Sequence, residues 1–330
     1  MRADAAAWFE ERTSKAEDWT HDLLLDTKGN TTVSVVLPAL NEEPTIGRIV
    51  HQINHVLGAA APKHRRLVDE LVVIDGGSSD RTAEVAAAAG ARVEFRANIL
   101  PHLPSIPGKG DAMWRSLAVT TGDLVVFVDA DLQSFTPSYI TGLIGPLLTH
   151  PEVALVKAVY ERPLVEGSTV VSAGGGRVTE LMARPLLNLL WPELAGIIQP
   201  LAGEYAARRE LLEQLPFPCG YGVEIGLLTD ALDRRGLAGL AQVDLGVRVH
   251  RQQDEVSLSR MAAEILRTAF ERLERRGDLK RLDEFGTTLT QFARGADGFT
   301  ATASITQATE HPPINSVAEY RDRGREYATP

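Results

Sequence analysis

The chain has 330 residues, of which 44% are hydrophobic and 24% are charged, as expected for a globular protein with a sizeable core. Its formal net charge of −10 at pH 7 gives no electrostatic basis for binding nucleic acid or an anionic membrane surface. The single cysteine, Cys219, excludes an intramolecular disulfide and a zinc site made of cysteines. Neither a signal peptide nor an apolar run of the roughly 20 residues that span a bilayer is recognisable, so we expect a cytoplasmic protein without stable membrane association.

The first half of the chain alternates between strand and helix patterns. Residues 1–30 are polar with a weakly apolar face and are expected to be helical. Apolar runs then predict strands at 32–37, 71–75, 92–95 and 125–128. Helices are predicted after residue 43, at 82–89 and at 109–121. This alternation predicts an α/β fold with a mostly parallel, doubly wound sheet, in which ligands lie beyond the carboxyl ends of the strands.

The second half of the chain is mixed. Strands are predicted at 153–160, 201–206 and 241–250, and helices at 178–190, 224–235 and 257–276. From residue 277 onward the composition is polar and weakly patterned, and the last 30 residues are expected to form a loose tail. The predicted segments are therefore 1–30, 31–150, 151–276 and 277–330, within one continuous domain because no flexible linker separates them.

An aspartate pair, Asp129 and Asp131, follows the apolar run at 125–128. Carboxylate oxygens at the end of a buried strand can bridge Mg²⁺ or Mn²⁺ to a diphosphate. A lone Asp-x-Asp is more often a solvated turn. Here two earlier strands also end in polar residues, Asn41-Glu42 after the first and Asp75 to Ser78 after the second. Three such strand ends in order favour a nucleotide-sugar site.

Two further segments fit this site. The residues from Pro38 to Glu42 would offer backbone groups and a carboxylate to a nucleoside, or alternatively Asn41 would cap the following helix. Lys109 lies between two glycines at a predicted helix start. There it can reach a phosphate or a sugar hydroxyl, or it can be a solvated lysine on a turn.

Four motifs carry a resemblance to a known class of enzymes: PALNE, DGGSSD, GKGDAMWRS and VDADL, in that order and spacing. They resemble the nucleotide-binding half of retaining glycosyltransferases with the GT-A fold. With GGGRVTE, PLAGEY, YGVEIG and VHR, the chain resembles the glucosyl-3-phosphoglycerate synthase and mannosyl-3-phosphoglycerate synthase family of actinobacteria. The resemblance extends over residues 31–255. It implies a Rossmann-like sheet flanked by helices for the nucleotide-sugar-binding half, 31–150, continuous with a mixed α/β acceptor-binding half, 151–276.

The resemblance also implies roles for individual residues. Nucleotide-sugar contacts are expected from Pro38, Ala39, Leu40, Asn41, Glu42, Ser78, Lys109, Asp129 and Ala130. Mg²⁺ or Mn²⁺ is expected on Asp131 and His250, although a histidine at a strand end is more often bonded to backbone. Catalytic roles are expected for Asp131, Lys109 and Glu224. Glu224 lies beside Tyr221 and Gly222 at a predicted helix start, where it would position the attacking hydroxyl or, alternatively, cap the helix or form a salt bridge.

The acceptor implied by the resemblance is 3-phosphoglycerate. Its contacts are expected from Gly176, Arg177, Val178, Thr179, Tyr221, Arg251 and Gln252. A glycine-rich loop with an arginine fork at a helix start suits a phosphate monoester, although it is also typical of a flexible loop entering an ordinary helix. Gln252 stands where the family often has asparagine, and Arg248 with Arg251 would help to neutralise the acceptor carboxylate.

The predicted function is transfer of glucose from a nucleoside diphosphate glucose, with UDP-glucose the expected donor, to the 2-hydroxyl of 3-phosphoglycerate with retention. The main alternative is transfer of mannose from GDP-mannose to the same acceptor. A polyprenyl-phosphate sugar transferase is disfavoured because the helix at 257–276 is too charged to face a membrane. A sensor that binds nucleotide sugars without turnover is also disfavoured, because a sensor would not need a loop that binds the phosphate of an acceptor. The resemblance also suggests a homodimer.

Overall fold

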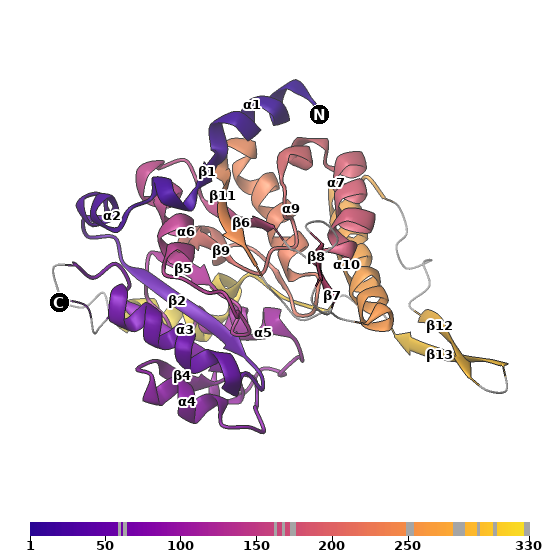
Figure 1. Cartoon of the computed structure of the whole chain (residues 1–330), viewed down its shortest axis with the longest axis horizontal. Coiled ribbons are helices and arrows are strands. Elements are labelled where there is room, and N and C mark those ends of the chain that lie inside the picture. The colour runs from indigo at the N-terminus through magenta and orange to yellow at the C-terminus, as the bar shows by residue number, and fades with distance from the viewer. Residues whose placement is uncertain are drawn as a thin grey trace.

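The computed structural model describes residues 1–58, 61, 65–161, 164–166, 169–171, 176–248, 254–279, 288–295, 298–305 and 309–326. An eight-stranded sheet crosses the molecule in the order β1-β11-β6-β9-β5-β2-β3-β4 (Figure 1). Its strands are β1 (Thr13–Lys15), β2 (Val33–Ala39), β3 (Glu70–Asp75), β4 (Arg92–Phe95), β5 (Leu124–Phe127), β6 (Leu155–Glu161), β9 (Tyr205–Arg208) and β11 (Leu240–Val247). Only β9 runs antiparallel to its neighbours in this sheet, so the predicted mostly parallel sheet is confirmed.

Helices cover both faces of the sheet, as the strand–helix alternation predicts. They are α1 (Ala3–Arg12), α2 (His21–Lys28), α3 (Glu43–Val56), α4 (Thr82–Ala88), α5 (Lys109–Ser116), α6 (Ser138–Thr149), α7 (Arg184–Leu190), α8 (Arg209–Leu212), α9 (Val223–Arg235), α10 (Glu255–Arg276) and α11 (Ala318–Glu326). Short strand pairs lie outside the sheet: β7 (Leu164–Glu166) with β8 (Thr169–Val171), β10 (Phe217–Pro218) with β14 (Glu310–His311), and β12 (Thr288–Gly295) with β13 (Gly298–Ile305). Among the described residues, none of the helices combines the length and the apolar composition that crossing a membrane requires.

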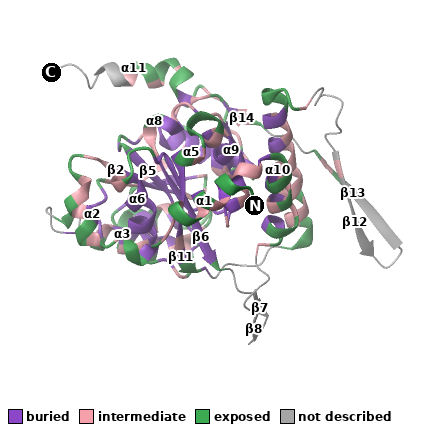
Figure 2. Ribbon diagram, turned by 90° about the horizontal axis from the view of Figure 1, so that it is seen from above, coloured by how far each residue is buried: buried purple, intermediate pink, exposed green. Residues whose placement is uncertain are grey.

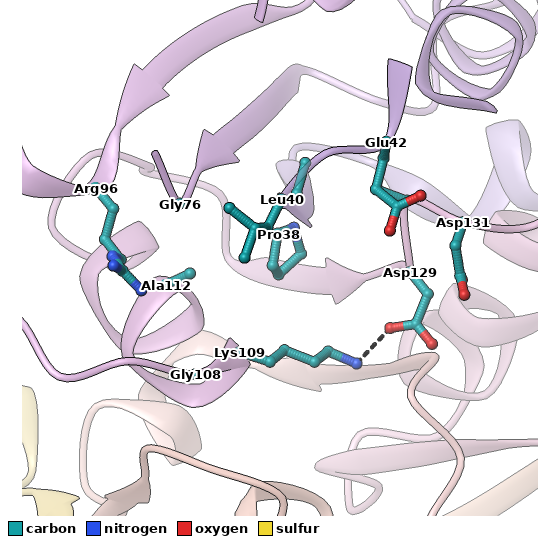
Figure 3. Close-up of a pocket in the computed structure, with 12 residues that line it drawn as sticks. Pro38, Leu40, Glu42, Gly76, Arg96, Gly108, Lys109, Ala112, Asp129 and Asp131 are labelled. Atoms are coloured by element: carbon teal, nitrogen blue, oxygen red, sulfur yellow. Dashed lines mark hydrogen bonds and ion pairs between the residues drawn. The ribbon is translucent and has the colours of Figure 1, made fainter. Parts of the chain in front are cut away.

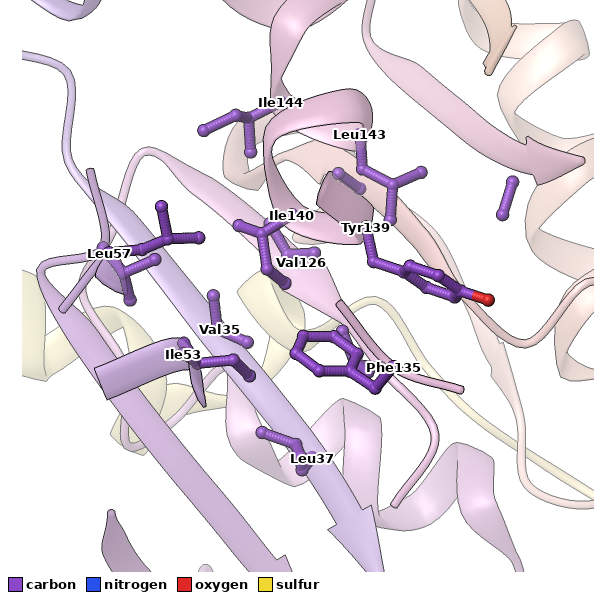
Figure 4. Close-up of a cluster of buried hydrophobic side chains, with 14 of the residues drawn as sticks. Val35, Leu37, Ile53, Leu57, Val126, Phe135, Tyr139, Ile140, Leu143 and Ile144 are labelled. Atoms are coloured by element: carbon purple, nitrogen blue, oxygen red, sulfur yellow. The ribbon is translucent and has the colours of Figure 1, made fainter. Parts of the chain in front are cut away.

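Each central strand contributes to two hydrophobic cores, one on each face of the sheet. Along β2, Val35 and Leu37 face the core that α3 and α6 cover, whereas Val36 faces the core that α5, α9 and α10 cover. Successive side chains of a strand point to opposite faces, so the continuous apolar run at the start of β2 is what a doubly covered sheet requires. Figure 4 shows the first core, where Ile53 of α3 and Ile140 of α6 lie beside Val35. Buried residues accordingly gather in the sheet and on the helix faces against it (Figure 2).

The N-terminal segment is only partly the helical segment that the sequence predicts. Thr13–Lys15 forms β1 and pairs in parallel with β11, which extends the sheet at its edge. Trp19 then packs against α6, where a Cβ on Gly145 would overlap the indole ring. A three-residue strand carries no periodicity that a sequence pattern could detect, so only its partner makes it a strand.

Two predicted helices differ from the observed ones. The helix predicted at 178–190 is divided into a π-helical turn, η4 (Thr179–Ala183), and α7. Pro185 lies at the junction and has no N–H to donate, which favours the change of hydrogen-bond register there. The helix predicted at 109–121 ends at Ser116, before the β-branched run of Val119, Thr120 and Thr121.

The expectation of a loose C-terminal tail is wrong for residues 309–326. β14 pairs with β10, and Ile314 is fully buried in the core beneath α5 and α9. His311 stacks on Trp114 of α5 with ring centroids 4.1 Å apart, and the Trp114 indole N–H donates to Pro312 O at 2.9 Å. A few buried side chains, rather than a periodic apolar face, hold this segment to the core. Its sequence therefore shows no pattern from which the packing could be predicted.

Candidate active site

A pocket of about 300 Å³ lies beyond the carboxyl ends of β2, β3 and β5. This is the position in which open α/β sheets bind ligands. Its lining residues are Pro38, Ala39, Leu40, Glu42, Gly76, Arg96, Gly108, Lys109, Ala112, Asp129, Ala130 and Asp131. Figure 3 shows the acidic side chains Glu42, Asp129 and Asp131 at one end and Arg96 at the other. The sequence therefore identified most of the residues that meet here, but not Arg96, Gly76, Gly108 or Ala112.

The loops after β2 and β3 hold one another in place. The Asn41 N–H donates to Ser78 Oγ at 3.0 Å, and the Ser79 N–H donates to Asn41 Oδ1 at 2.8 Å. Asn41 has a φ of 59°, in the left-handed region that asparagine tolerates better than most residues. Asn41 therefore does not cap α3, and its side chain instead links the loop that carries Glu42 to the neighbouring loop.

Lys109 is not a solvated lysine on a turn. Its ammonium group lies 2.5 Å from Asp129 Oδ1, 3.0 Å from Gly203 O and 3.3 Å from Glu224 Oε1, which uses all three of its donors. Burial alone would lower the pKa of Lys109, but the charges of Asp129 and Glu224 outweigh burial and hold that pKa above its ordinary value. Lys109 therefore stays charged and ties the ends of β5, α9 and the 199–204 segment together.

The glycines that flank Lys109 have a packing role. A Cβ on Gly108 would overlap Cys219 O, and a Cβ on Gly110 would overlap Pro218 O. The Gly110 N–H donates to Cys219 O at 3.0 Å. These glycines let α5 approach the 217–220 segment closely, and this contact aims Lys109 at the pocket.

Asp129 is the most strongly paired carboxylate of the site. It accepts from Lys109 on one oxygen and from Arg248 Nη2, at 2.9 Å, on the other. Burial raises the pKa of Asp129, but the charges of Lys109 and Arg248 overcome this and hold that pKa far below its usual range. Asp129 is therefore ionised whenever the protein is folded at ordinary pH.

Asp131 differs from Asp129 in both exposure and charge balance. Its side chain is 48% exposed, and the nearest cation in the described part of the chain is Arg248 at 3.4 Å. Burial and the neighbouring charge of Asp129 raise the pKa of Asp131. A cation beside Asp131 would relieve the repulsion between the two carboxylates, so the donor set fits a hard divalent ion on Asp131.

Arg248 joins the aspartates to a buried glutamate, a role that the sequence did not predict. Its guanidinium donates to Glu204 at 2.9 Å and to the Tyr160 hydroxyl at 2.8 Å. Glu204 is fully buried, and burial raises the pKa of Glu204. The expectation that Arg248 would neutralise an acceptor carboxylate is wrong in this structure, because both of its terminal nitrogens already donate to carboxylates of the protein, Nη1 to Glu204 and Nη2 to Asp129. Glu204 lies in the motif PLAGEY and Arg248 directly precedes VHR, but neither spacing nor pattern indicates that they pair.

The residues expected to hold the metal are only partly described. His250 lies outside the described residues, as do Arg251 and Gln252. Within the described part of the chain, no three side chains of the His, Cys, Asp and Glu types converge as a metal site. Asp131 is therefore the one predicted metal ligand whose position can be given.

The expected acceptor residues that the structure describes lie on two segments. Gly176 has a φ of 80°, and Arg177 has an exposed side chain with Nη1 3.7 Å from Glu255 Oε1. Val178 and Thr179 are buried at the start of the following helical segment. On the second segment, Tyr221 is exposed and Glu224 lies beside Lys109. Glu224 thus connects the predicted acceptor side to the donor pocket.

Comparison with known proteins places the chain among sugar transferases. Residues 34–215 match the model of glycosyl transferase family 2. The chain is 47% identical over 310 residues to the glucosyl-3-phosphoglycerate synthase of Mycolicibacterium smegmatis, covering 94% of this chain and 98% of that protein. It is 50% identical over 280 residues to the enzyme of the same name from Mycobacterium tuberculosis, covering 84% of this chain and 82% of that protein.

Two solved structures share the fold. The crystal structure of mannosyl-3-phosphoglycerate synthase from Rubrobacter xylanophilus superposes with a TM-score of 0.86 at 41% identity, covering 96% of this chain and 98% of the other. The crystal structure of the Mycobacterium tuberculosis glucosyl-3-phosphoglycerate synthase, in complex with Mn²⁺, uridine diphosphate and phosphoglyceric acid, superposes with a TM-score of 0.78 at 47% identity. It covers 90% of this chain and 95% of the other. The chain is therefore a glycosyltransferase with the GT-A fold, and it belongs to the family of glucosyl- and mannosyl-3-phosphoglycerate synthases within glycosyl transferase family 2.

Proposed function

We propose that the protein transfers glucose from UDP-glucose to the 2-hydroxyl of 3-phosphoglycerate, with retention of configuration at the anomeric carbon. The observation that carries this proposal is the position of Lys109, which lines the acidic end of the pocket with Asp129 and donates to both Asp129 and Glu224. The chain is 47% identical to a glucosyl-3-phosphoglycerate synthase whose structure contains uridine diphosphate and phosphoglyceric acid. A pocket of about 300 Å³ is at the lower end of the usual range for small-ligand sites.

The donor would lie with its diphosphate at the acidic end of the pocket. There Asp131 would hold Mg²⁺ or Mn²⁺, with His250 as the predicted second ligand. When bound, such an ion stabilises the negative charge that develops on a departing diphosphate. Asp129, locked between Lys109 and Arg248, would present a fixed carboxylate to the hydroxyls of the ribose or the sugar.

The acceptor would approach from the side of Glu224. Glu224 accepts from Lys109, which holds its carboxylate where it can orient the attacking hydroxyl. Arg177 and Gly176 would receive the acceptor phosphate, since an arginine beside bare backbone N–H groups suits that group. We assign no side chain as a covalent nucleophile. For a transfer with retention we therefore predict that the acceptor hydroxyl attacks from the same face that the diphosphate leaves, with catalysis by positioning of the two substrates.

A second donor is favoured by a specific observation. The mannosyl-3-phosphoglycerate synthase structure superposes with a TM-score of 0.86, so transfer of mannose from GDP-mannose to the same acceptor is the alternative. The homodimer and the cytoplasmic location stay predictions from the sequence.

Sugar transfer by the purified protein tests the proposal. UDP-glucose and GDP-mannose are each incubated with Mn²⁺, with and without 3-phosphoglycerate, and products are identified by mass. We expect glucosyl-3-phosphoglycerate, and its loss in Arg177→Ala but not in Arg260→Ala, which removes an exposed arginine of α10. Mannosyl-3-phosphoglycerate alone would favour the alternative donor. Release of nucleotide without a phosphoglycerate product would contradict the acceptor assignment.

A further inference from the structure

The first two turns of α3 lie against the loop that carries Asp131. This loop, residues 130–134, follows β5 and the first aspartate of the pair. α3 begins directly after Glu42, and Figure 3 shows Glu42 on the same side of the pocket as Asp131. The motifs PALNE and VDADL supply the two segments that meet here, but neither includes the residues of α3 that contact the loop.

Two side chains of α3 bind carbonyl groups on both sides of Asp131. Thr45 Oγ1 donates to Ala130 O at 2.7 Å. Arg48 Nη2 donates to Leu132 O at 3.0 Å and also to the carbonyl of the next residue. Positions three apart in a helix lie on one face, one turn from each other, so both side chains reach the same loop. α3 thus holds the backbone before Asp131 and the backbone after it.

These bonds fix the part of the main chain from which the Asp131 side chain projects. A peptide group is planar, so a bonded carbonyl also fixes the N–H of the following residue. The Ala130 carbonyl belongs to the peptide group that contains the Asp131 N–H. The Leu132 carbonyl belongs to the second peptide group beyond it. Asp131 therefore lies between two anchored peptide groups.

The two aspartates of the pair are held in different ways. Lys109 and Arg248 both bond to the carboxylate of Asp129 directly. Within the part of the chain that the structure describes, the only side chain that bonds to the Asp131 carboxylate is Arg248, at 3.4 Å. Asp129 is thus positioned through its side chain, whereas the position of Asp131 depends on its backbone and on the helix that holds it.

The support that α3 provides is itself anchored. The Glu42 N–H donates to Thr82 Oγ1 at 2.8 Å, which joins the start of α3 to the start of α4. At the other end of the 130–134 loop, Ser134 Oγ donates to Val247 O at 3.3 Å, at the end of β11. The loop is therefore fixed between a helix on one side and a strand end on the other.

We propose that Thr45 and Arg48 are positioning residues that hold Asp131 in the place from which it binds a hard divalent cation. The inference rests on the proposed function for the identity of Asp131 as a metal ligand. Groups that orient a metal ligand typically contribute about 10- to 100-fold to metal affinity. The charge of Arg48 acts in the opposite direction, because a nearby cation repels the metal ion. Thr45 carries no charge and is therefore the cleaner probe.

Mn²⁺ binding tests the inference without depending on sugar transfer. Mn²⁺ is titrated calorimetrically into the full-length protein with UDP present. Thr45→Val keeps the shape of the side chain and lacks the hydroxyl, and we expect it to lower the Mn²⁺ affinity about tenfold. Thr45→Ser keeps the hydroxyl and should bind Mn²⁺ within about threefold of wild type. Thermal unfolding without metal should be the same for both variants.

Arg48 is tested in parallel. Arg48→Met removes the bonds and the charge, and we expect the Mn²⁺ affinity to fall at least about fivefold. Arg48→Lys keeps a donor and the charge but lacks the planar fork, so it should lose less than Arg48→Met. His51, one turn further along α3, stacks its ring on His55 and provides the control. His51→Met should keep the wild-type Mn²⁺ affinity.

Three outcomes would overturn the inference. The first is wild-type Mn²⁺ affinity in Thr45→Val and Arg48→Met. The second is a higher affinity in Arg48→Met, because Arg48 would then act only as a repelling charge. The third is a fall in metal-free unfolding temperature that Thr45→Ser shares with Thr45→Val, because the contact would then serve folding alone.

Asp131→Asn separates this inference from the proposed function. Weaker Mn²⁺ binding in Asp131→Asn but not in the α3 variants would reject the inference and keep the metal ligand. Unchanged binding in Asp131→Asn would reject both. Weaker binding in Asp131→Asn and in the α3 variants of a protein that transfers no sugar to phosphoglycerate would support the inference and reject the proposed reaction.

Discussion

Gly203 leaves the space that the Asp129 carboxylate occupies. A Cβ on residue 203 would overlap both carboxylate oxygens, with Asp129 Cγ only 2.8 Å away. The backbone carbonyl of the same glycine accepts from Lys109 at 3.0 Å. One residue thus makes room for the aspartate and helps to orient the lysine that binds it, so the geometry of the acidic end depends on the absence of a side chain at this position.

Replacing Gly203 by alanine should impair catalysis more than folding. The new methyl group would push Asp129 away from Lys109 and Arg248, and small displacements of positioned groups can cost about 100-fold in rate. We expect kcat to fall at least about tenfold. Gly29→Ala is the control, since Gly29 has open space around it and should report only backbone strain at a φ of 55°. Equal kcat values for wild type and Gly203→Ala would contradict this prediction.

Replacing Arg248 by methionine should destabilise the protein. The change leaves Glu204 buried beside Asp129 without its cation, and breaking such a buried pair typically costs about 3–5 kcal/mol in the free energy of unfolding. The double variant Arg248→Met/Glu204→Gln should recover at least about 1 kcal/mol of that loss, because it removes the uncompensated carboxyl group. Urea denaturation measures both variants. The exposed pair Arg81–Glu84 provides the control, where Arg81→Met should change stability by less than about 1 kcal/mol.

The buried Lys157 should make stability depend on pH. It lies under the site, with Nζ 2.6 Å from Ala202 O and 4.4 Å from the centroid of the Tyr205 ring. Burial lowers the pKa of Lys157 from 10.5 to about 7. Between these values the unfolded chain binds a proton that the folded protein does not, so this group makes the free energy of unfolding rise with pH.

Substitution of Lys157 isolates this effect. Lys157→Met lacks the titrating group, so wild type should gain stability relative to the variant by up to ~1.4 kcal/mol per pH unit from pH 8 to pH 9. Urea denaturation at pH 7, 8 and 9 gives the comparison. A difference between the two proteins that stays constant over this range would show that Lys157 remains charged in the folded state.

Asp131→Asn should weaken metal binding with little effect on folding. The side chain is 48% exposed and, among the residues that the structure describes, has a single, loose ion pair, so its charge contributes little to stability. Loss of the anionic oxygen should lower the Mn²⁺ affinity, measured by calorimetry with UDP present, at least about tenfold. Asp129→Asn is the informative partner, because it should instead lower stability by removing the counter-charge of Lys109 and Arg248. Unchanged Mn²⁺ affinity in Asp131→Asn would remove Asp131 from the metal site.

His311→Phe should destabilise the protein although it lies in the segment that the sequence suggested was a tail. Phenylalanine keeps an aromatic ring against Trp114 but cannot bond to the buried Asp111. We expect a loss of about 1.5–3 kcal/mol in the free energy of unfolding, as for hydrogen bonds to charged groups. Glu319→Ala, an exposed position on α11, should have no measurable effect and serves as the control. Equal stability of wild type and His311→Phe would mean that the 309–317 segment contributes little to the fold.

The sequence by itself determined the parallel strands β2, β3, β4 and β5 and the residues that follow them at the carboxyl edge of the sheet. Apolar runs bounded by turn residues are local signals, and parallel strands bring their ends to one edge whatever their order in the sheet. Pro38 to Glu42, Lys109 and the pair Asp129–Asp131 could therefore be assigned to one pocket from the sequence alone. The sequence also shows the two glycines beside Lys109. It does not show that they allow α5 to approach the 217–220 segment closely.

The tertiary structure alone decided which distant groups meet. Whether Arg248 faces an acceptor or the protein's own Asp129 and Glu204 depends on how β11 and β5 are placed across the sheet, and no sequence spacing encodes that distance. The same holds for Arg96 at the far end of the pocket and for His311 on Asp111, 200 residues apart in the chain. Periodicity reports which face of an element is buried, whereas partner choice depends on the packing of whole elements, because charge pairs form only where burial and geometry coincide.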